Sequence, residues 1–332
     1  MKRFSCPSCS NEVHFDNAAC VVCGSALGYL PSAFDMVTPV QPCANAEPAG
    51  CNWLVEDGEP FCAACRHNRT VPDLSNDENR TRWAAIELAK RQLFYSLHRW
   101  GLPTPVGDAP PALVFDFLAD EIAKDGSAKP VLTGHANGLI TLNIAEGDDA
   151  EREARRAAMG EPYRTLVGHL RHEIGHFYWD RLVRDSAQTD RFRALFGDER
   201  ADYSEALKRH YENGPPADWR QNQITAYAAA HPWEDFAETW AHWTHMVDGL
   251  ETAWAYDMGQ PGVRFDPYGA PDAQSVIDAW VPVSIAVNAI NRSLGQPDLY
   301  PFVLSAPVMD KLDFIRDLIA PHRSTTNRPT TN

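Results

Sequence analysis

Apolar residues recur at helical spacing along several long stretches of the chain. Residues 79–99 carry a helical pattern of apolar residues among charged ones, which predicts a helix. Its apolar residues are Trp83, Ile86, Leu88, Leu93, Tyr95 and Leu97. Pro162 suits the first position of a helix and begins a similar pattern that continues to about residue 185. Further helices are predicted over residues 149–158, 202–213, 222–230, 232–249, 273–293 and 307–320.

Two shorter stretches have the composition of β-strands. The segments "ALVFDFL" at 112–118 and "GLITLNI" at 138–144 are rich in β-branched or aromatic residues, and Gly or Pro residues bound them. The predicted fold class is therefore α+β, with many helices and a small β-sheet. The polar segment 322–332 is predicted to be a disordered tail.

The cysteines divide the chain into two parts. All eight lie between residues 6 and 65, which predicts an N-terminal domain over 1–70 and a second domain over 79–321. We see no secretory signal and no apolar run near the ~18 residues of a membrane span, so we expect a cytoplasmic protein without membrane partners. In that reducing compartment, eight cysteines indicate metal sites rather than disulfides.

The cysteine spacing predicts two structural zinc sites. Cys6 and Cys9, like Cys20 and Cys23, are separated by two residues, and such paired knuckles hold one tetrahedral zinc ion. A second, looser set has His67 as a spare ligand and consists of Cys43, Cys51, Cys62 and Cys65. The alternative for either set is free buried thiols. Four-cysteine sites have no open position, so they stabilise the fold of a zinc ribbon and do no chemistry.

The charge of the chain excludes one common function of zinc ribbons. The formal net charge is −15, with 45 acidic against 30 basic residues, so binding to nucleic acid or to anionic membranes is not expected. Residues 1–70 contain four basic residues (Lys2, Arg3, Arg66, Arg69) against seven acidic ones. The predicted partner of the ribbon is therefore a protein.

A second kind of metal site is predicted in "LRHEIGHFYW", residues 170–179. His172 and His176 lie one helical turn apart, so their imidazoles can bind one metal while Glu173 takes a proton from a water beside it. On a helical projection these residues share an arc with His169 and Asp180, next to an apolar arc, so we expect one face in the core and the other at a cleft. The alternative is a merely polar helix face.

The predicted third ligand lies in "HPWEDFAETWAHWTH", residues 231–245. Glu234 and Glu238 are one turn apart, so that one can bind zinc while the other accepts the spare N–H of a ligand histidine. The alternative is an exposed acidic first turn stabilised by the helix dipole. His231, His242 and His245 are rival ligands, but their spacing gives them no advantage over Glu234.

Two further polar residues lie on the first motif helix. Asp180 is predicted to pair with Arg184, four residues on. His169 is an extra imidazole on the ligand face, which either serves substrate or caps a cavity. The metzincin pattern is absent, because Trp179 and Leu182 occupy the places of its Gly and third His.

Through "EPYRTLVGHLRHEIGHFYWDRL" and "HPWEDFAETWAHWTH", the chain resembles a bacterial family of zinc-binding metallopeptidases with an N-terminal zinc ribbon. The resemblance runs from Cys6 to about residue 320 and implies a zincin-like domain. The second segment is also similar to gluzincins of the anthrax lethal factor type. That similarity implies that Glu234 binds zinc, Glu238 supports the site, and Tyr227, seven residues before Glu234, stabilises the transition state.

These expectations combine into a hydrolytic mechanism. One catalytic zinc, besides the two structural ions, is held by His172, His176 and Glu234, and Glu173 is the general base for attack on a peptide or protein substrate. The general zincin fold implies that "GLITLNI" is the sheet edge on which an extended peptide lies. One alternative is a non-catalytic zinc-ribbon interaction protein with a metallopeptidase-like domain. Another is hydrolysis of a non-peptide amide.

Overall fold

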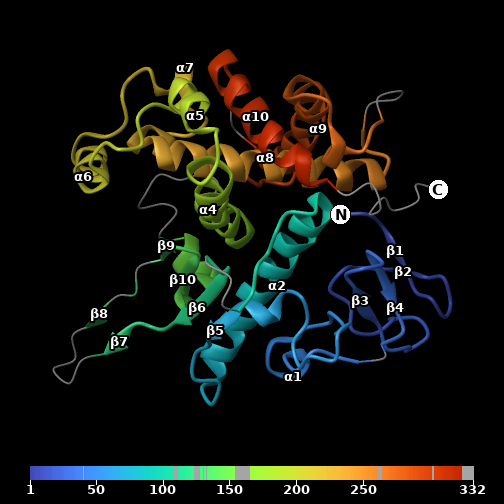
Figure 1. The fold of residues 1–332 in the computed structure, drawn as a ribbon. Coiled ribbons are helices and arrows are strands. Elements are labelled where there is room, and N and C mark those ends of the chain that lie inside the picture. The colour runs from blue at the N-terminus through green and yellow to red at the C-terminus, as the bar shows by residue number, and fades with distance from the viewer. Residues whose placement is uncertain are drawn as a thin grey trace. The chain divides into compact units, whose positions relative to one another are not determined.

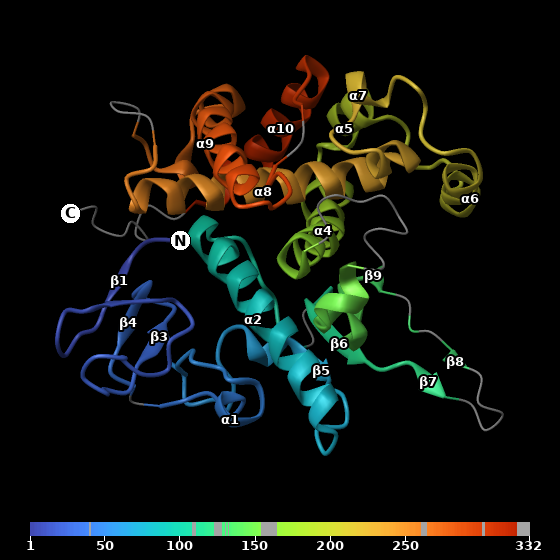
Figure 2. The ribbon, with the colours of Figure 1, turned by 180° about the vertical axis from the view of Figure 1, so that it is seen from behind.

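The computed structural model describes residues 1–39, 41–107, 111–122, 128–129, 131, 133–153, 165–259, 264–300 and 303–323. Their contacts group them into two units, drawn in Figures 1 and 2. The N-terminal unit contains the described residues of 2–153 and 165–170, and the C-terminal unit contains Met1 and those of 171–323. Each unit is described in turn.

Small antiparallel hairpins and an aromatic cluster build the first part of the N-terminal unit. β1 (Phe4–Ser5) pairs with β2 (Glu12–Val13), and β3 (Gly28–Leu30) pairs with β4 (Asp35–Val37). The short helix α1 (Ala46–Ala49) and the 3-10 turn η1 (Cys65–His67) follow. The rings of Phe15, Tyr29 and Trp53 pack on one another, with the Phe15 and Tyr29 centroids 4.8 Å apart, and Phe15 and Tyr29 also pack on Tyr95 of the next helix. The cysteine-rich segment is therefore anchored to that helix.

That helix, α2 (Asp77–Trp100), confirms the one predicted over 79–99. It begins where the side chain of Asn76 accepts hydrogen bonds from two free backbone N–H groups, those of Glu78 and Asn79. It ends at Gly101, which has a φ of 69° that favours glycine. Its buried residues include Trp83, Ile86 and Leu93, as the helical pattern predicts.

A four-stranded sheet with the order β5-β6-β10-β9 completes the N-terminal unit. Its strands are β5 (Asn68–Thr70), β6 (Val114–Leu118), β9 (Gly134–Ala136) and β10 (Leu139–Asn143), and β7 (Glu121–Ile122) pairs separately with β8 (Ala128–Lys129). β6 and β10, which lie within the two predicted strands, pair in parallel. The short turn η2 (Ile144–Gly147) follows β10.

The expectation that "GLITLNI" forms a sheet edge is wrong. β10 pairs with β6 on one side and with β9 on the other, so its backbone groups are already used. The edge strands of this sheet are β5 and β9. Strand composition cannot show this, because the antiparallel partner of β10 is the short polar segment "GHA", which has no strand pattern.

The C-terminal unit is helical and is organised around α8 (Pro232–Ala255). In both views α9 (Ala273–Ser293) and α10 (Ala306–Ile319) lie along one side of α8, and α4 (Leu166–Trp179) meets its other side. The remaining elements are the π-helical turn η3 (Asp180–Arg184), α5 (Thr189–Phe196), α6 (Tyr203–Asn213), α7 (Trp219–Asn222) and the 3-10 turns η4 (Tyr227–Ala230), η5 (Pro267–Gly269) and η6 (Ala320–His322).

Most helix predictions for this unit are confirmed. The helices expected over 202–213, 232–249, 273–293 and 307–320 are α6, α8, α9 and α10. The pattern expected from 162 to about 185 is α4 followed by η3, with residues 162–164 outside the described residues. In the N-terminal unit, residues 149–153 of the helix predicted over 149–158 are helical, and the rest lie outside the described residues, as does most of the predicted tail 322–332.

The helix predicted over 222–230 is wrong. The chain is extended at Gln223, where α7 ends, and only the 3-10 turn η4 precedes α8. The Thr225 hydroxyl accepts a hydrogen bond from the backbone N–H of Ala228, and this local bond competes with a regular helix. His231 is extended because it directly precedes Pro232, which disfavours helical geometry in the residue before it.

Helix α9 is, among the described residues, the one helix long and apolar enough to cross a membrane by length and composition. In the apolar 18-residue stretch of this helix, 39% is buried inside the protein. The inner face, including Val276, Trp280 and Val283, is buried in the C-terminal unit. Core helices of soluble proteins pass the same test, so this is weak evidence for a membrane span.

Candidate metal centres

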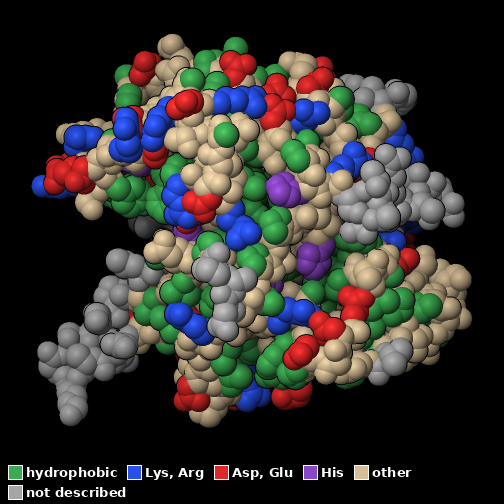
Figure 3. Space-filling view, viewed as in Figure 1, with side chains coloured by type: hydrophobic (Ala, Val, Ile, Leu, Met, Phe, Trp, Pro, Cys, Tyr) green, Lys and Arg blue, Asp and Glu red, His purple; other side chains and the backbone are tan. Residues whose placement is uncertain are grey.

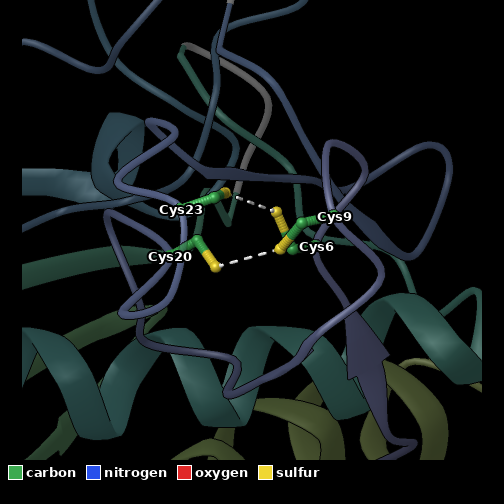
Figure 4. Close-up of side chains that lie close together, drawn as sticks. All are labelled: Cys6, Cys9, Cys20 and Cys23. Atoms are coloured by element: carbon green, nitrogen blue, oxygen red, sulfur yellow. Dashed lines mark hydrogen bonds between the residues drawn. The ribbon is translucent and has the colours of Figure 1, made fainter.

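The first four cysteines form a compact cluster at the tips of two similar loops. Cys6 lies 3.7 Å from Cys23, and Cys9 lies 3.7 Å from Cys20, between sulfur atoms (Figure 4). Each loop is closed by a backbone hydrogen bond to the carbonyl of its first cysteine, from Ser10 or from Gly24. Tetrahedral zinc with Zn–S bonds of about 2.3 Å places its sulfurs about 3.8 Å apart. The cluster therefore has the size of a zinc site.

The second four cysteines also converge, although their spacing is irregular. The Cys51 sulfur lies 3.7 Å from the sulfurs of Cys62 and Cys65, and all four cysteines of the set are buried. The Cys43 sulfur accepts backbone N–H groups from Asn45 and Cys62, at 3.5 and 3.4 Å, as a thiolate ligand does. The cluster consists of Cys43, Cys51, Cys62 and Cys65, and His67 is not part of it.

Charged residues of α2 lie next to this second cluster. The Cys65 sulfur is 3.4 Å from Glu87 Oε2, and Glu87 Oε1 accepts a 2.7 Å hydrogen bond from Lys90, whose side chain is fully buried. Burial raises the pKa of Glu87 to about 7, although Lys90 opposes the rise. His67 instead bonds the carbonyl of Leu113 through Nδ1, at 2.8 Å. The second cluster therefore lies at the contact between the ribbon and α2.

The third cluster depends on a close approach of α4 and α8. Gly175, between the two histidines of α4, faces Ala237 and Trp240 of α8. A Cβ atom at Gly175 would lie 3.0 Å from the Cα of Ala237, closer than ordinary van der Waals contact. The missing side chain therefore allows the helices to touch at the level of the histidines and the glutamates.

His172, His176 and Glu234 meet there with the spacing of metal ligands. Glu234 Oε2 lies 3.0 Å from Nε2 of His172 and 3.5 Å from Nε2 of His176, and the two Nε2 atoms are 3.1 Å apart. Bonds of about 2.0–2.1 Å to tetrahedral zinc place ligand atoms about 3.3 Å apart. Glu234 Oε2 is buried and accepts no hydrogen bond within the described part of the chain. The three side chains therefore fit one zinc ion.

Glu238 orients one of these histidines. Its Oε1 atom lies 2.6 Å from Nδ1 of His172, and its Oε2 atom accepts a 2.7 Å hydrogen bond from the hydroxyl of Thr225. Because a carboxylate only accepts, Nδ1 carries the proton and Nε2 of His172 is left for a metal. Glu238 is thus placed where a supporting residue is expected, and Thr225 is a contributor that the sequence did not indicate.

The charges of the cluster stabilise one another. Burial by itself lowers the pKa of His172, but Glu234 and Glu238 raise it well above its usual value. Burial by itself raises the pKa of Glu234, but His176 and His172 hold it well below its usual range. The Glu234 carboxylate is therefore ionised, which is the form that binds a metal.

Glu173 and two tyrosines lie around the cluster. The ring of Tyr227, in η4, is 5.9 Å from that of His172. Burial is the main cause of the raised pKa values of Tyr227 and Tyr203, and the charges of Glu234 and Glu173 contribute to both. Both phenols therefore stay protonated and can donate hydrogen bonds. Glu173 is itself buried, as are the ligand residues His172 and His176.

Tyr203 and Trp233 are contacts that the sequence analysis missed. The Tyr203 hydroxyl donates a 2.6 Å hydrogen bond to Glu234 Oε1, from a helix that begins 31 residues earlier in the chain. The Trp233 ring packs 4.0 Å from that of His176, between centroids. Trp233 directly precedes Glu234 and could have been noticed, whereas no spacing pattern links Tyr203 to the motifs.

The rival histidines of α8 have other partners. His231 caps the helix, since its Nδ1 atom accepts the backbone N–H of Trp233 at 3.1 Å. His242 is buried and lies 2.8 Å from the hydroxyl of Tyr300 through Nδ1, and the His245 ring stacks on Tyr300. None of the three belongs to a metal cluster within the described ranges.

The two remaining polar residues of α4 and η3 are also accounted for. His169 lies against Glu146 in the N-terminal unit, and Glu146 accepts a 2.8 Å hydrogen bond from the Thr133 hydroxyl. Asp180 bonds Arg184 at 2.8 Å, which confirms the predicted pair four residues apart. Neither residue lies among the ligand groups of the described chain.

Comparisons with known proteins agree with these sites. The family model described as "Putative zinc-binding metallo-peptidase" matches residues 79–318, and a zinc-ribbon domain model matches residues 3–76. Uncharacterized proteins of Mycobacterium bovis and of two strains of Mycobacterium tuberculosis are 43% identical over 331 residues. The aligned region covers 96% of this chain and 95% of each relative. No solved structure matches the chain.

The fold and the sites identify the chain's class. It is an α+β protein with a cysteine-rich N-terminal region and a mostly helical remainder, and its two four-cysteine clusters and its histidine–glutamate cluster are sites for zinc. With matches that together cover nearly its whole length, the chain belongs to the family of zinc-binding metallopeptidases that carry an N-terminal zinc ribbon.

Proposed function

We propose that the protein is a zinc metallopeptidase of the gluzincin type that hydrolyses amide bonds in peptides or proteins. One observation supports this most strongly: His172, His176 and Glu234, from two different helices, direct three ligand atoms at one point. Three protein ligands leave a fourth position of a tetrahedral ion for water or substrate, unlike the four-cysteine clusters. Zinc held there supplies Lewis-acid polarisation of a carbonyl and lowers the pKa of water.

Glu173 is the proposed general base of the reaction. It follows His172 on α4 and is buried. The pKa values of Tyr203 and Tyr227 are raised mainly by burial and also by the charges of Glu234 and Glu173, so these residues lie around the same site. A carboxylate in this position accepts the proton of the attacking water and passes it to the leaving amine. Glu238 keeps the His172 ring in the orientation and tautomer that a metal ligand needs.

Tyr227 is the proposed donor to the developing oxyanion. Its ring packs near His172, and burial keeps its hydroxyl protonated, so it can give a hydrogen bond to the oxygen that becomes negative on attack. Removing one such donor typically costs about 10²–10³ in kcat. Loss of Tyr227, like loss of Glu173, should therefore lower turnover without removing a metal ligand.

The ribbon is proposed to contact a protein. At the tip of one knuckle, Val21 and Val22 are 83% and 67% exposed, and an apolar tip suits protein contact better than nucleic acid. On the face in Figure 3, acidic and basic side chains alternate, and neither forms a continuous patch. We further propose a cytoplasmic location, because thiols that hold zinc require a reducing compartment.

A peptide library tests the proposal. The zinc-loaded protein should cleave peptides, and a chelator should abolish cleavage. Glu173→Gln should lower the rate by ~10² or more with the zinc content unchanged, as expected for a general base. Cleavage that survives in Glu173→Gln would remove this residue from the mechanism. Binding of peptides by the loaded wild type without any cleavage would instead favour the non-catalytic interaction protein.

A further inference from the structure

The two oxygens of Glu234 have different partners. Oε1 accepts the Tyr203 hydroxyl at 2.6 Å, a length in the range of about 2.5–2.7 Å for hydrogen bonds from a hydroxyl to a carboxylate. Oε2 faces the Nε2 atoms of His172 and His176 at 3.0 and 3.5 Å. The carboxylate is therefore fixed in one orientation, with one oxygen bound by the protein and the other directed at the metal position.

The Tyr203 ring is fixed against the beginning of the helix that carries Glu234. It makes edge contacts with His231 and Trp233, at centroid distances of 5.3 and 5.8 Å. His231 is in turn the N-cap of α8, one turn from the carboxylate. The position of the Tyr203 hydroxyl is thus set by the same helix start that sets Glu234.

Residues of α6 other than Tyr203 contribute little to the contact between Tyr203 and Glu234. Ala206 is the one buried residue of the helix, and Tyr203 itself is 36% exposed. The side chain of Asp202 accepts the backbone N–H of Glu205 at 2.9 Å and so fixes the first turn. The hydrogen bond from Tyr203 is therefore a specific link between α6 and the metal cluster, and not a by-product of a packed core.

We propose that Tyr203 is the positioning residue for Glu234, holding Oε1 so that the carboxylate offers zinc only Oε2. Groups that orient a metal ligand from outside typically change metal affinity about 10–100-fold when they are removed. Glu238 does this for His172 from α8, and Tyr203 does it for Glu234 from α6. The inference rests on the proposed function only in that it concerns the same zinc ion, and it does not require peptide cleavage.

Tyr203→Phe tests the proposal, because it removes the hydroxyl and keeps the ring that packs on His231 and Trp233. Competition with a chelator should show a zinc dissociation constant raised ~10–100-fold at the histidine–glutamate site. Ser204→Ala is the matched control, since it removes a hydroxyl from the next residue of the same helix, where the side chain is exposed. It should bind zinc as the wild type does.

The visible absorption spectrum of bound cobalt distinguishes a role of Tyr203 in positioning Glu234 from a role in packing alone. With zinc kept in the cysteine sites and cobalt in the third site, Tyr203→Phe frees Oε1 to bind the metal and should alter the visible absorption that reports coordination number. An unchanged spectrum together with unchanged zinc affinity would overturn the proposal. If Tyr203→Phe weakens zinc binding in a protein that cleaves no peptide, the inference stands and the proposed function fails. If the wild type cleaves and Tyr203→Phe keeps both the zinc affinity and the spectrum of the wild type, the inference alone fails.

Discussion

The close contact of α4 and α8 predicts that Gly175→Ala damages the metal site although it replaces no metal ligand. The added methyl group would lie 3.0 Å from the Cα of Ala237 and 3.2 Å from the Cβ of Trp240. Carbon atoms in good contact are about 3.5–4.0 Å apart, so the helices must separate by several tenths of an ångström. The atoms in the way belong to the backbone or lie next to it, and no flexible side-chain end can rotate aside.

Two opposing terms set the magnitude of this effect. Alanine is about 1 kcal/mol more favourable than glycine in a helix, and overpacking of a core typically costs about 1–3 kcal/mol. We expect a net loss of about 1 kcal/mol in the free energy of unfolding. Separation of the helices also moves Glu234 away from His172 and His176. Binding of zinc must then bring the two helices back together against about 1–2 kcal/mol of strain. The zinc dissociation constant should therefore rise ~5–30-fold.

Urea unfolding of the zinc-loaded protein and competition with a chelator measure the two effects. Gly134→Ala is the control, because a Cβ there meets no atom within 4 Å. A Gly175→Ala protein that is more stable than the wild type and binds zinc equally well would refute the reasoning. That result would mean that the helix contact does not determine the position of the ligands.

Three other changes test separate parts of the account. Glu238→Ala removes the acceptor of the His172 ring, so zinc affinity should fall ~10–100-fold in the same competition assay, and an unchanged affinity would exclude an orienting role. Lys311→Ala leaves Asp235 as a buried carboxylate without the ion pair that Lys311 forms at 2.6 Å, and should cost about 3–5 kcal/mol in urea unfolding. A loss below about 1 kcal/mol would show that solvent reaches Asp235. Burial lowers the pKa of His242 from 6.5 to about 4, so the folded state resists its protonation and stability should fall as the pH drops from 6.5 towards 4. The fall attributable to this group is at most about 3 kcal/mol, and His242→Asn should make the pH dependence shallower.

Local patterns predicted the helices and the separate motifs well, because each depends on residues close in sequence. The knuckles at Cys6 and Cys20 and the pair His172 and His176 are set by two- and four-residue spacings. The meeting of Glu234 with these histidines was predicted from the resemblance to a family and because a catalytic zinc ion needs a third protein ligand. Its physical cause is the contact at Gly175, which no spacing rule identifies.

Features that depend on tertiary contact were missed or mispredicted. Tyr203 reaches Glu234 only because α6 folds back against the start of α8. Helix α5 was not predicted, although its buried residues Phe192 and Phe196 lie one turn apart. The central position of β10 depends on pairing with the polar strand β9. Thr225 both ends the irregular segment before η4 and supports Glu238, and these two roles are visible only in three dimensions.

Counting zinc by native mass spectrometry tests the central claim, that side chains from α4 and α8 bind one ion in addition to those of the cysteine clusters. The wild type should carry three zinc ions per chain, one for each cluster of ligand groups. Glu234→Ala should carry two, with the cysteine sites still filled. Two ions in the wild type, or three in a protein lacking both His172 and His176, would contradict the account.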